Sequence, residues 1–468
     1  MVLSFNVLST MLLAELPGGN LANYGVTGLF MFTVVTVGLF ARKSIWVGAE
    51  WMLLMAWLLY AVVPAMLSQD VESSMFKVLT VLQLAVWALA IQQSILWRMG
   101  ATAPLLMYGA AVTVAYAVSF AGIGVGVVEG SPDATGRVAS TLVNANTFGA
   151  AAVMGLSLCL LAASGPLGPK AWLIQVVMAL ALVVAVVNSG SRTALVGMLF
   201  LLLGASWAFQ FWRLKQFVRM FPSFLMIVVV ASATYFVVKD MPVFADRVDS
   251  VFSLEDSNSM VSRLWDFIGV VGAGSLSAEE GGESMSQRFE LVLVGLDLLL
   301  QSNLVGIGPD NFRSLIGAYS HSNVIEILVA TGVVGILLYY SIYVALVWRC
   351  ASILRVDRSH RVARMALVAL ATLSLMDIQH VSYDTKQGWL FLAILIGTVE
   401  VARRRALASR TASNKADKRT AEDSHAPEAT GVMATPRLVS QTTLAPSTPI
   451  KLDTDRHVAL KAIRPLKD

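Results

Sequence analysis

Two arginines and one histidine stand out as residues that could do chemistry together. Arg192 lies in a tight polar turn between two apolar runs, Arg288 lies near the start of an amphipathic segment, and His321 directly precedes a long apolar run. Guanidinium groups bind phosphate oxygens bidentately and keep their charge at physiological pH. Histidine titrates near neutral pH and can serve as a general base or a charged stabiliser. We therefore predict these three residues to be the catalytic residues of a transferase site for a lipid-linked phosphate donor.

Four uncharged polar residues near these positions are predicted to bind substrate. Asn144 and Asn146 open the apolar run that begins near residue 142. Ser191 precedes the arginine of the polar turn, and Asn323 follows the histidine by two residues. Their amide and hydroxyl groups can donate and accept hydrogen bonds, as a sugar or phosphate ligand requires.

Each candidate also has a structural alternative. Arg192 could be a snorkelling interfacial residue, and Arg288 a solvated charge on a helix face. His321 could cap the helix expected from residue 324, and the asparagines could cap or connect helices. Glu326 lies inside an apolar run, where an unpaired carboxylate is costly, so we expect it to have a structural partner such as an interhelical amide. The confinement of the candidates to one face of the membrane favours the functional interpretation.

Other kinds of site are not indicated by the sequence. It contains no G-x-S-x-G, no H-E-x-x-H and no P-loop. No basic stripe is interleaved with aromatic residues, so we predict no nucleic-acid partner. Cys159 and Cys350 fit neither a disulfide framework nor a metal site, and we expect both to pack as small apolar residues. We predict no metal site.

The composition indicates a membrane protein. The chain of 468 residues is 56% hydrophobic and 14% charged, whereas soluble domains are roughly 45–50% apolar and 25% charged. A spanning helix needs about 20 mostly apolar residues. On that basis we predict an all-α, polytopic fold with eleven spans, and residues 2–16 form either a twelfth span or an interfacial helix. The predicted spans are 24–41, 46–66, 76–97, 102–122, 142–164, 171–188, 193–212, 220–238, 324–348, 363–381 and 387–402.

The basic residues between the spans alternate in number from one side to the other. Cytoplasmic loops of membrane proteins carry an excess of Lys and Arg. We therefore place the arginine-rich connections in the cytoplasm, together with the C-terminal tail. The opposite face, which carries few basic residues, holds all seven candidate residues. The cytoplasmic set is Arg42, Lys43, Arg98, Lys170, Arg213, Lys215, Arg219, Arg349, Arg355, Arg358, Arg361, Arg364, Arg403, Arg404 and Arg405; the short outward loops hold only Lys77, Arg137, Arg192 and Lys386.

Four regions follow from these assignments. Residues 1–238 form an N-terminal transmembrane bundle and 239–323 a long outward loop. Residues 324–402 form C-terminal transmembrane helices, and 403–468 a cytoplasmic tail that is too poor in large apolar residues to fold alone. Within the loop, residues 284–301 place apolar side chains at helical spacing, which predicts an amphipathic helix.

Short motifs in this order resemble the O-antigen ligase and O-antigen polymerase (Wzy-type) family of membrane glycosyltransferases. They are the turn from Ser189 to Leu195, the segment from Arg288 through Gly306-Ile307-Gly308 to Phe312, and His321-Ser322-Asn323 with the glycines Gly332 and Gly335 beyond it. The segment from Asn144 to Phe148 also looks like a family feature. The similar region spans roughly residues 140–400.

The resemblance implies a GT-C-like membrane fold of about twelve spans and an active site facing the periplasm of a bacterial inner membrane. It implies a donor glycan linked to undecaprenyl pyrophosphate and a transfer that needs no metal, nucleotide sugar or other cofactor. Carried over residue by residue, Arg192 and Arg288 would hold the donor pyrophosphate. His321 would assist the attack of an acceptor hydroxyl at the anomeric carbon.

Three functions remain open at this point. The first is a ligase that moves the lipid-linked glycan onto lipid A-core or a comparable acceptor. The second is a polymerase of O-antigen or exopolysaccharide that uses a second lipid-linked repeat as acceptor. The third, from another class, is a glycolipid transporter or flippase, which would place its site near the membrane midplane rather than at one face.

Overall fold

A computed structural model of the protein describes residue 6 and residues 19–98, 102–120, 145–165, 168–210 and 285–424. Every regular element in these ranges is a helix. The chain divides into two compact units, residues 1–413 and 414–468. The packing described below is that of the first unit, which contains helices α2 to α15 and residues 386–413 of α16. The helices are α2 (Gly19–Phe40), α3 (Ala49–Met66), α4 (Val71–Arg98), α5 (Thr102–Phe120), α6 (Ala145–Ala163), α7 (Pro169–Asn188), α8 (Arg192–Phe209), α12 (Met285–Gln301), α13 (Asn311–Ile316), α14 (Asn323–Val356), α15 (Arg361–Met376) and α16 (Lys386–Ser424).

These helices confirm the prediction of an all-α, multi-pass membrane protein. Five are long and apolar enough to cross a membrane, namely Ala49–Met66, Val71–Trp97, Asn146–Ala163, Pro169–Asn188 and Asn323–Val356, and three shorter apolar helices accompany them. Ten of the eleven predicted spans coincide with helices. The predicted span 220–238 and, apart from Asn6, the segment 2–16 lie outside the described residues, so the number of spans stays a prediction.

Two helices continue beyond their predicted ends. α14 runs to Val356 and α16 to Ser424, whereas the apolar pattern ends near residues 348 and 402. The added turns are rich in Arg, Ala, Leu and Lys, which are good helix formers, so the backbone stays helical where the side chains become polar. An apolar pattern measures the length of a span, not that of the helix that contains it.

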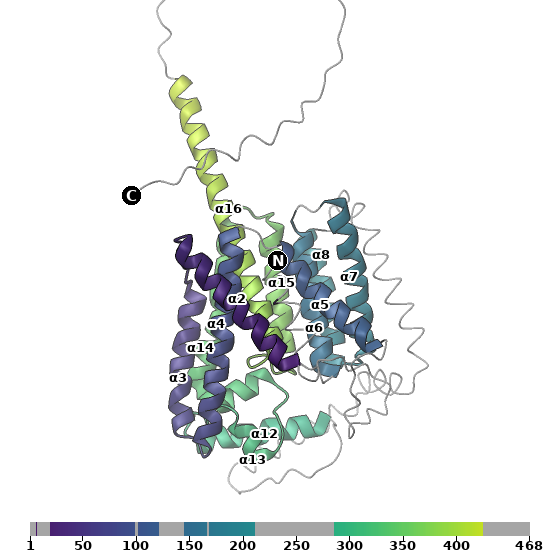
Figure 1. The fold of residues 1–468 in the computed structure, drawn as a ribbon, viewed down its shortest axis with the longest axis vertical. Helices are drawn as coiled ribbons and strands as arrows, with labels where there is room; N and C mark the ends of the chain where they lie inside the picture. The colour runs from purple at the N-terminus through teal and green to yellow at the C-terminus, as the bar shows by residue number, and fades with distance from the viewer. Residues whose placement is uncertain are drawn as a thin grey trace, which may run out of the picture. The chain divides into compact units, whose positions relative to one another are not determined.

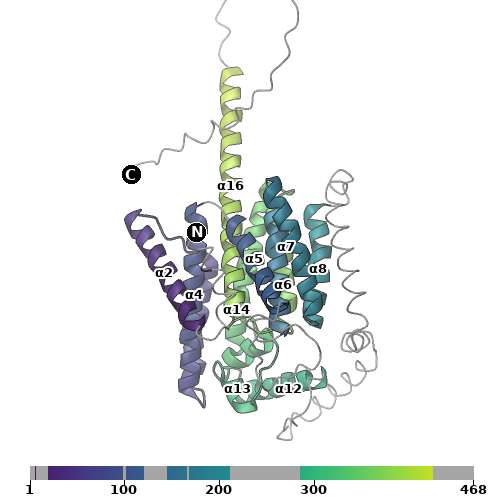
Figure 2. The ribbon, with the colours of Figure 1, turned by 45° about the vertical axis from the view of Figure 1, so that its right-hand side comes forward.

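The bundle is assembled through a few close helix pairs (Figures 1 and 2). α14 packs along α3, α15 along α8, and α6 lies against α5, α7 and α8. Small residues permit these approaches, as is common between membrane helices. A Cβ on Gly204 would lie 2.5 Å from a methyl group of Val368, and one on Gly109 would lie 2.6 Å from the Sγ atom of Cys159. Cys159 and Cys350 are both buried free thiols, which confirms their predicted role as packing residues.

α12 and α13 lie together at one end of the bundle, where α12 runs crosswise to the upright helices (Figures 1 and 2). α12 confirms the amphipathic helix predicted over residues 284–301. Its Leu291 forms a buried cluster with Phe312 and with Val329 of α14. A Cβ on Gly295 would lie 3.1 Å from Ile325 and 3.0 Å from Val329. The predicted outward segment is therefore anchored on the first turns of α14.

A break in α14 locks the loop before α13 onto the helix. Gly332 is non-helical, with φ +69°, inside the helix. The N–H of Ile307 donates to the carbonyl of Val329 at 2.9 Å, that of Gly308 to Ala330 at 3.0 Å, and that of Val333 to Leu304 at 3.1 Å. The loop thus satisfies backbone groups that a break would otherwise leave unpaired in an apolar setting.

Glycine is required at the break itself. A Cβ on Gly332 would collide with the carbonyl groups of Leu304 and Val305, and its left-handed backbone disfavours other residues. The motif Gly306-Ile307-Gly308 in the loop and Gly332 in the helix therefore serve one purpose. They allow the backbones of the loop and of α14 to contact each other directly.

Candidate active site at the start of helix α14

His321 stands immediately before α14 in a strained backbone conformation. Its φ is +56°, in the left-handed region that few residues other than glycine adopt. The N-cap of α14 is Ser322, whose Oγ accepts from the N–H of Ile325 at 3.4 Å. The alternative in which His321 caps the helix is therefore wrong. Strained residues persist where their surroundings over-determine them, and such positions cluster at functional sites.

The residue before His321 is fixed by a buried carboxylate. Ser320 donates from Oγ to Oε2 of Glu326 at 2.8 Å, and its backbone N–H reaches the same oxygen at 3.3 Å. Glu326 is 1% exposed. The expectation of a structural partner for Glu326 is confirmed, although the partner is the loop before its own helix and not an interhelical amide. The carboxylate ties the loop to α14 one turn after His321.

The residues after His321 are bonded to the turn 377–385 between α15 and α16. The Asn323 side-chain carbonyl accepts from the N–H groups of Ser382 at 3.0 Å and Tyr383 at 2.9 Å. The backbone N–H of Asn323 donates to the carbonyl of Asp377 at 2.8 Å. Asn323 is fully buried. The structure gives this residue a positioning role, and substrate binding by Asn323 stays a prediction.

Asp377, the first residue of this turn, accepts hydrogen bonds from several hydroxyl groups. Its carboxylate accepts from Ser382 Oγ at 2.6 Å and from the Tyr343 hydroxyl at 3.0 Å, with the Tyr340 hydroxyl at 3.4 Å. Tyr340 and Tyr343 also meet edge to face, with ring centroids 5.2 Å apart. A buried carboxylate with three hydroxyl donors is well satisfied, so the network holds the turn 377–385 against the middle of α14.

The start of α8 reaches the same turn. Thr193 Oγ1 donates to Gln379 Oε1 at 2.5 Å. Arg192 is the first residue of α8, and Ser191 is its N-cap, accepting from the N–H of Ala194 at 3.4 Å. The backbone of Arg192 is thereby placed beside the turn that holds Asn323. The capping bond gives Ser191 a structural function; a substrate contact by this residue stays a prediction.

α6 begins against the polar turn that carries Arg192. A Cβ on Gly149 would lie 2.6 Å from Ser189 Oγ and 3.1 Å from the Cβ of Ser191. Asn146 lies one turn before Gly149 on the same helix. The structure therefore brings the start of α6 to this end of the bundle, as predicted, whereas Asn144 lies outside the described residues.

Arg288 belongs to the first turn of α12. Two turns further along, Gly295 packs on α14 beside Ile325 and Val329, so the helix carrying Arg288 is docked on the helix that His321 precedes. The side chains of Arg192 and Arg288 lie outside what the structure describes. Their convergence on one ligand stays a prediction.

Three charged residues that sequence reasoning did not combine support the loop before His321. Lys77 of α4 lies 2.6 Å from Asp384 and 3.7 Å from Asp310. Asp310 also accepts from Ser73 Oγ at 3.2 Å, and Asn311 donates to Ser74 Oγ at 2.7 Å. α4, the loop at 310 and the turn 377–385 are thus held together.

The ion pairs of Lys77 join residues more than 230 positions apart in the sequence, and no local pattern indicates them. The sequence held only a weak indication of this ion pair. Lys77 and Asp384 are charges of opposite sign that lie at the ends of apolar runs on the same predicted face of the membrane.

Residues 176–340 match the family model described as O-antigen ligase. This match confirms the predicted family resemblance. The matched region, about a third of the chain, contains Arg192, Arg288 and His321, whereas Asn146 and the turn 377–385 lie outside it. A search of curated proteins found no match. The family supports a ligase or polymerase type of function in general, with a lipid-linked glycan and a lipid acceptor.

Among the residues that the structure describes, no group of three or more His, Cys, Asp or Glu side chains could hold a metal ion. That the transfer needs no metal or other cofactor stays a prediction.

Proposed function

We propose that the protein is a glycosyltransferase of the ligase type. It moves a glycan from undecaprenyl pyrophosphate onto lipid A-core or a comparable acceptor at the periplasmic face of the inner membrane. The observation that carries the proposal is the meeting of two helix starts at one turn. α14 follows His321 and α8 begins at Arg192, both within the region that matches the O-antigen ligase model, and both helix starts bond to the turn 377–385.

In this proposal the acceptor hydroxyl attacks the anomeric carbon of the donor sugar while His321 takes its proton. The bond between that carbon and the pyrophosphate oxygen breaks, and the bonding electrons leave with the pyrophosphate. The products are the glycosylated acceptor and undecaprenyl pyrophosphate. Arg192 and Arg288 bind the pyrophosphate and stabilise the negative charge that grows on it, so they contribute more in the transition state than in the ground state.

The anchoring of His321 supports this role. Its neighbours on both sides are bonded to buried groups, Ser320 to Glu326 and Asn323 to the turn 377–385. A general base is effective when it is held within hydrogen-bond distance of the proton it removes. Backbone strain at a residue fixed on both sides is consistent with selection for position at the expense of stability.

The proposal is tested by reconstituting the full-length protein with an undecaprenyl-pyrophosphate-linked glycan and lipid A-core. Glycosylated lipid A-core should form, and it should be lost in Arg192→Ala, Arg288→Ala and His321→Ala variants that are present at normal levels in the membrane. Full activity of either arginine variant would contradict the pyrophosphate assignment.

The acceptor is tested separately in a strain that lacks the protein. A ligase predicts loss of long lipopolysaccharide bands with accumulation of lipid-linked polymer. Lipopolysaccharide capped with single repeats would identify a polymerase instead. Unchanged glycans together with a missing exported lipid would identify a transporter.

A further inference from the structure

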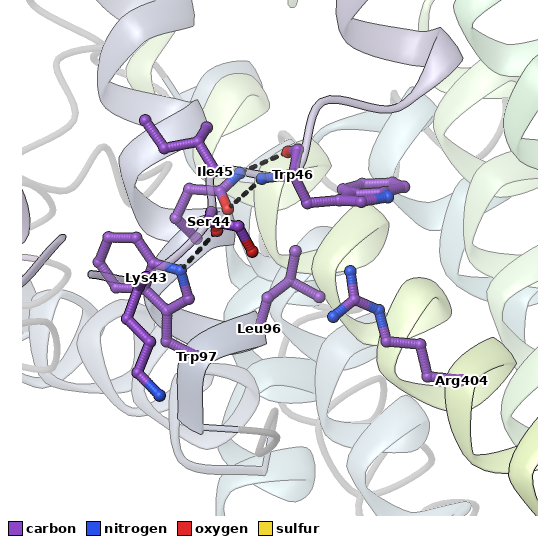
Figure 3. A pocket seen from close by; sticks show the side chains of 8 residues that line it. Lys43, Ser44, Ile45, Trp46, Leu96, Trp97 and Arg404 are labelled. Carbon is purple, nitrogen blue, oxygen red and sulfur yellow. Dashed lines mark hydrogen bonds between the residues drawn. The ribbon is translucent and has the colours of Figure 1, made fainter. Parts of the chain in front are cut away.

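A second polar site lies at the other end of α4. A cavity of about 320 Å³ is lined by residues that include Lys43, Trp46, Leu96, Trp97 and Arg404 (Figure 3). Lys43 and Trp46 lie in the segment between α2 and α3, Leu96 and Trp97 lie in the last turn of α4, and Arg404 lies in α16. None of them takes part in the candidate active site. The cavity is of a size that accommodates small ligands, for which about 300 Å³ is a lower bound.

The length of α4 places this cavity on the opposite face of the membrane. Lys77 contacts the candidate active site near the start of α4, and Leu96 lines the cavity near its end. Leu96 comes nineteen residues after Lys77, which is a rise of roughly 28 Å at 1.5 Å per residue. This is close to the roughly 30 Å thickness of a bilayer's hydrocarbon core. The cavity therefore lies at headgroup level in the leaflet predicted to be cytoplasmic.

Hydrogen bonds to α4 shape the wall of the cavity. The backbone N–H of Trp46 donates to Gln93 Oε1 at 3.1 Å, and Gln93 Nε2 donates to the carbonyl of Trp46 at 2.7 Å. The indole N–H of Trp97 donates to the carbonyl of Ser44 at 3.2 Å (Figure 3). The segment joining α2 to α3 is thus hydrogen-bonded to the last turns of α4. It places two indole rings at this end of α4, and tryptophans are enriched at membrane interfaces.

The charges behind this wall leave a positive balance. Glu400 accepts hydrogen bonds from Arg349, Arg403 and Arg404, and Arg349 also pairs with Glu50 at 2.7 Å. Three guanidinium groups therefore face two carboxylates. The bond from Arg404 to Glu400 uses Nε, and Figure 3 shows the rest of its guanidinium directed toward Trp46 and Leu96.

Lys43, which also lines the cavity, adds a further positive charge. It is exposed and forms no ion pair with any residue that the structure describes. Beside it, Ile45 is 65% exposed, an apolar side chain suited to contact with an acyl chain. The site thus combines two cations, an indole-lined wall and an apolar edge at headgroup depth.

We propose that this cavity binds the phosphate headgroup of an anionic phospholipid. Lys43 and Arg404 contact the phosphate, the indole rings lie against the glycerol region, and the acyl chains run past Ile45 into the bilayer. A basic pocket at the interface recognises headgroup charge, and each basic residue near an anionic surface contributes about a fivefold factor in affinity.

The test uses the full-length protein in nanodiscs that contain dioleoylphosphatidylglycerol and dioleoylphosphatidylcholine, with bound lipid counted by native mass spectrometry. Lys43→Gln should weaken retention of phosphatidylglycerol about fivefold, and Lys43→Gln with Arg404→Gln about 25-fold. Lys170→Gln is the matched control, because Lys170 is an exposed lysine on the same predicted face, outside the cavity. Retention of phosphatidylcholine should not change in any variant.

Three outcomes would overturn the proposal. Phosphatidylglycerol retention equal in the wild type and both cavity variants shows that the cavity does not bind this lipid. An equal loss in the Lys170→Gln control shows a general surface effect. Displacement of the lipid by millimolar inorganic phosphate identifies a site for free phosphate. Because Lys43 forms no described ion pair, its single variant tests the site even if the double variant folds poorly.

Discussion

Replacement of His321 by glycine should separate strain from chemistry at the candidate active site. With φ at +56°, the histidine holds a backbone conformation that costs a non-glycine residue about 1 kcal/mol or more. Glycine adopts this conformation without a steric penalty. We therefore expect His321→Gly to raise the free energy of unfolding by about 1 kcal/mol, a shift in melting temperature of about 1 to 2 °C for a chain of this size.

The same substitution should abolish catalysis. Loss of a general base lowers turnover by about 10²- to 10⁴-fold, so stability and activity should change in opposite directions. Donor binding should change much less than turnover; an equal loss of both would indicate that His321 positions the donor. The assays are thermal unfolding of the full-length protein in detergent, glycan transfer in proteoliposomes, and binding of the lipid-linked donor.

Asn303→Gly is the matched control. Asn303 also has a left-handed backbone, with φ +54°, and lies between α12 and α13. Its replacement should leave transfer unchanged and raise stability less, because asparagine tolerates this conformation better than most residues. Retention of more than a tenth of wild-type transfer by His321→Gly would refute the role of the imidazole, and a lower melting temperature would refute the account of strain.

The remaining predictions concern the arginines, the supporting ion pairs and the break in α14. Arg192→Lys and Arg288→Lys should retain more transfer than the alanine variants but less than the wild type, because lysine keeps the charge and loses the bidentate geometry; kcat and KM measured in proteoliposomes check this. Lys77→Met should lower stability by about 1 to 3 kcal/mol, because it leaves the carboxylate of Asp384 without its 2.6 Å partner, and Lys77→Arg should restore much of the loss in thermal unfolding. Gly332→Ala should destabilise the protein by about 2 kcal/mol or more, because the added Cβ meets carbonyl oxygens in a left-handed backbone. A variant that melts at the same temperature as the wild type would argue against the described break in α14.

Much of the fold followed from local patterns. The apolar runs predicted ten of the helices now described, and helical spacing predicted α12 inside the long segment 239–323. These predictions succeeded because a spanning segment must satisfy its own backbone hydrogen bonds and expose apolar side chains, both of which are local requirements. The helix ends beyond residues 348 and 402 were missed, because the apolar pattern stops where lipid contact ends. The residues that follow still favour a helix.

The site was predicted less completely. Residue types and charge alternation singled out Arg192, Arg288 and His321, and the family match covers all three. They did not reveal that Ser322 caps α14 or that Glu326 holds Ser320, because a serine and a histidine before a helix start are both plausible caps. The pairing of Lys77 with Asp384 depends on which helices are neighbours.

The amino-acid sequence alone therefore determined the class of the protein, the positions of most spans and the residue types suited to a lipid-linked phosphate. The tertiary structure decided which helix starts meet. Gly332 and the loop at Gly306–Gly308 form one backbone contact, and Asn323 bonds to a turn about sixty residues away. Such contacts depend on how the helices pack, and packing is a property of the assembled bundle that no single segment of the chain encodes.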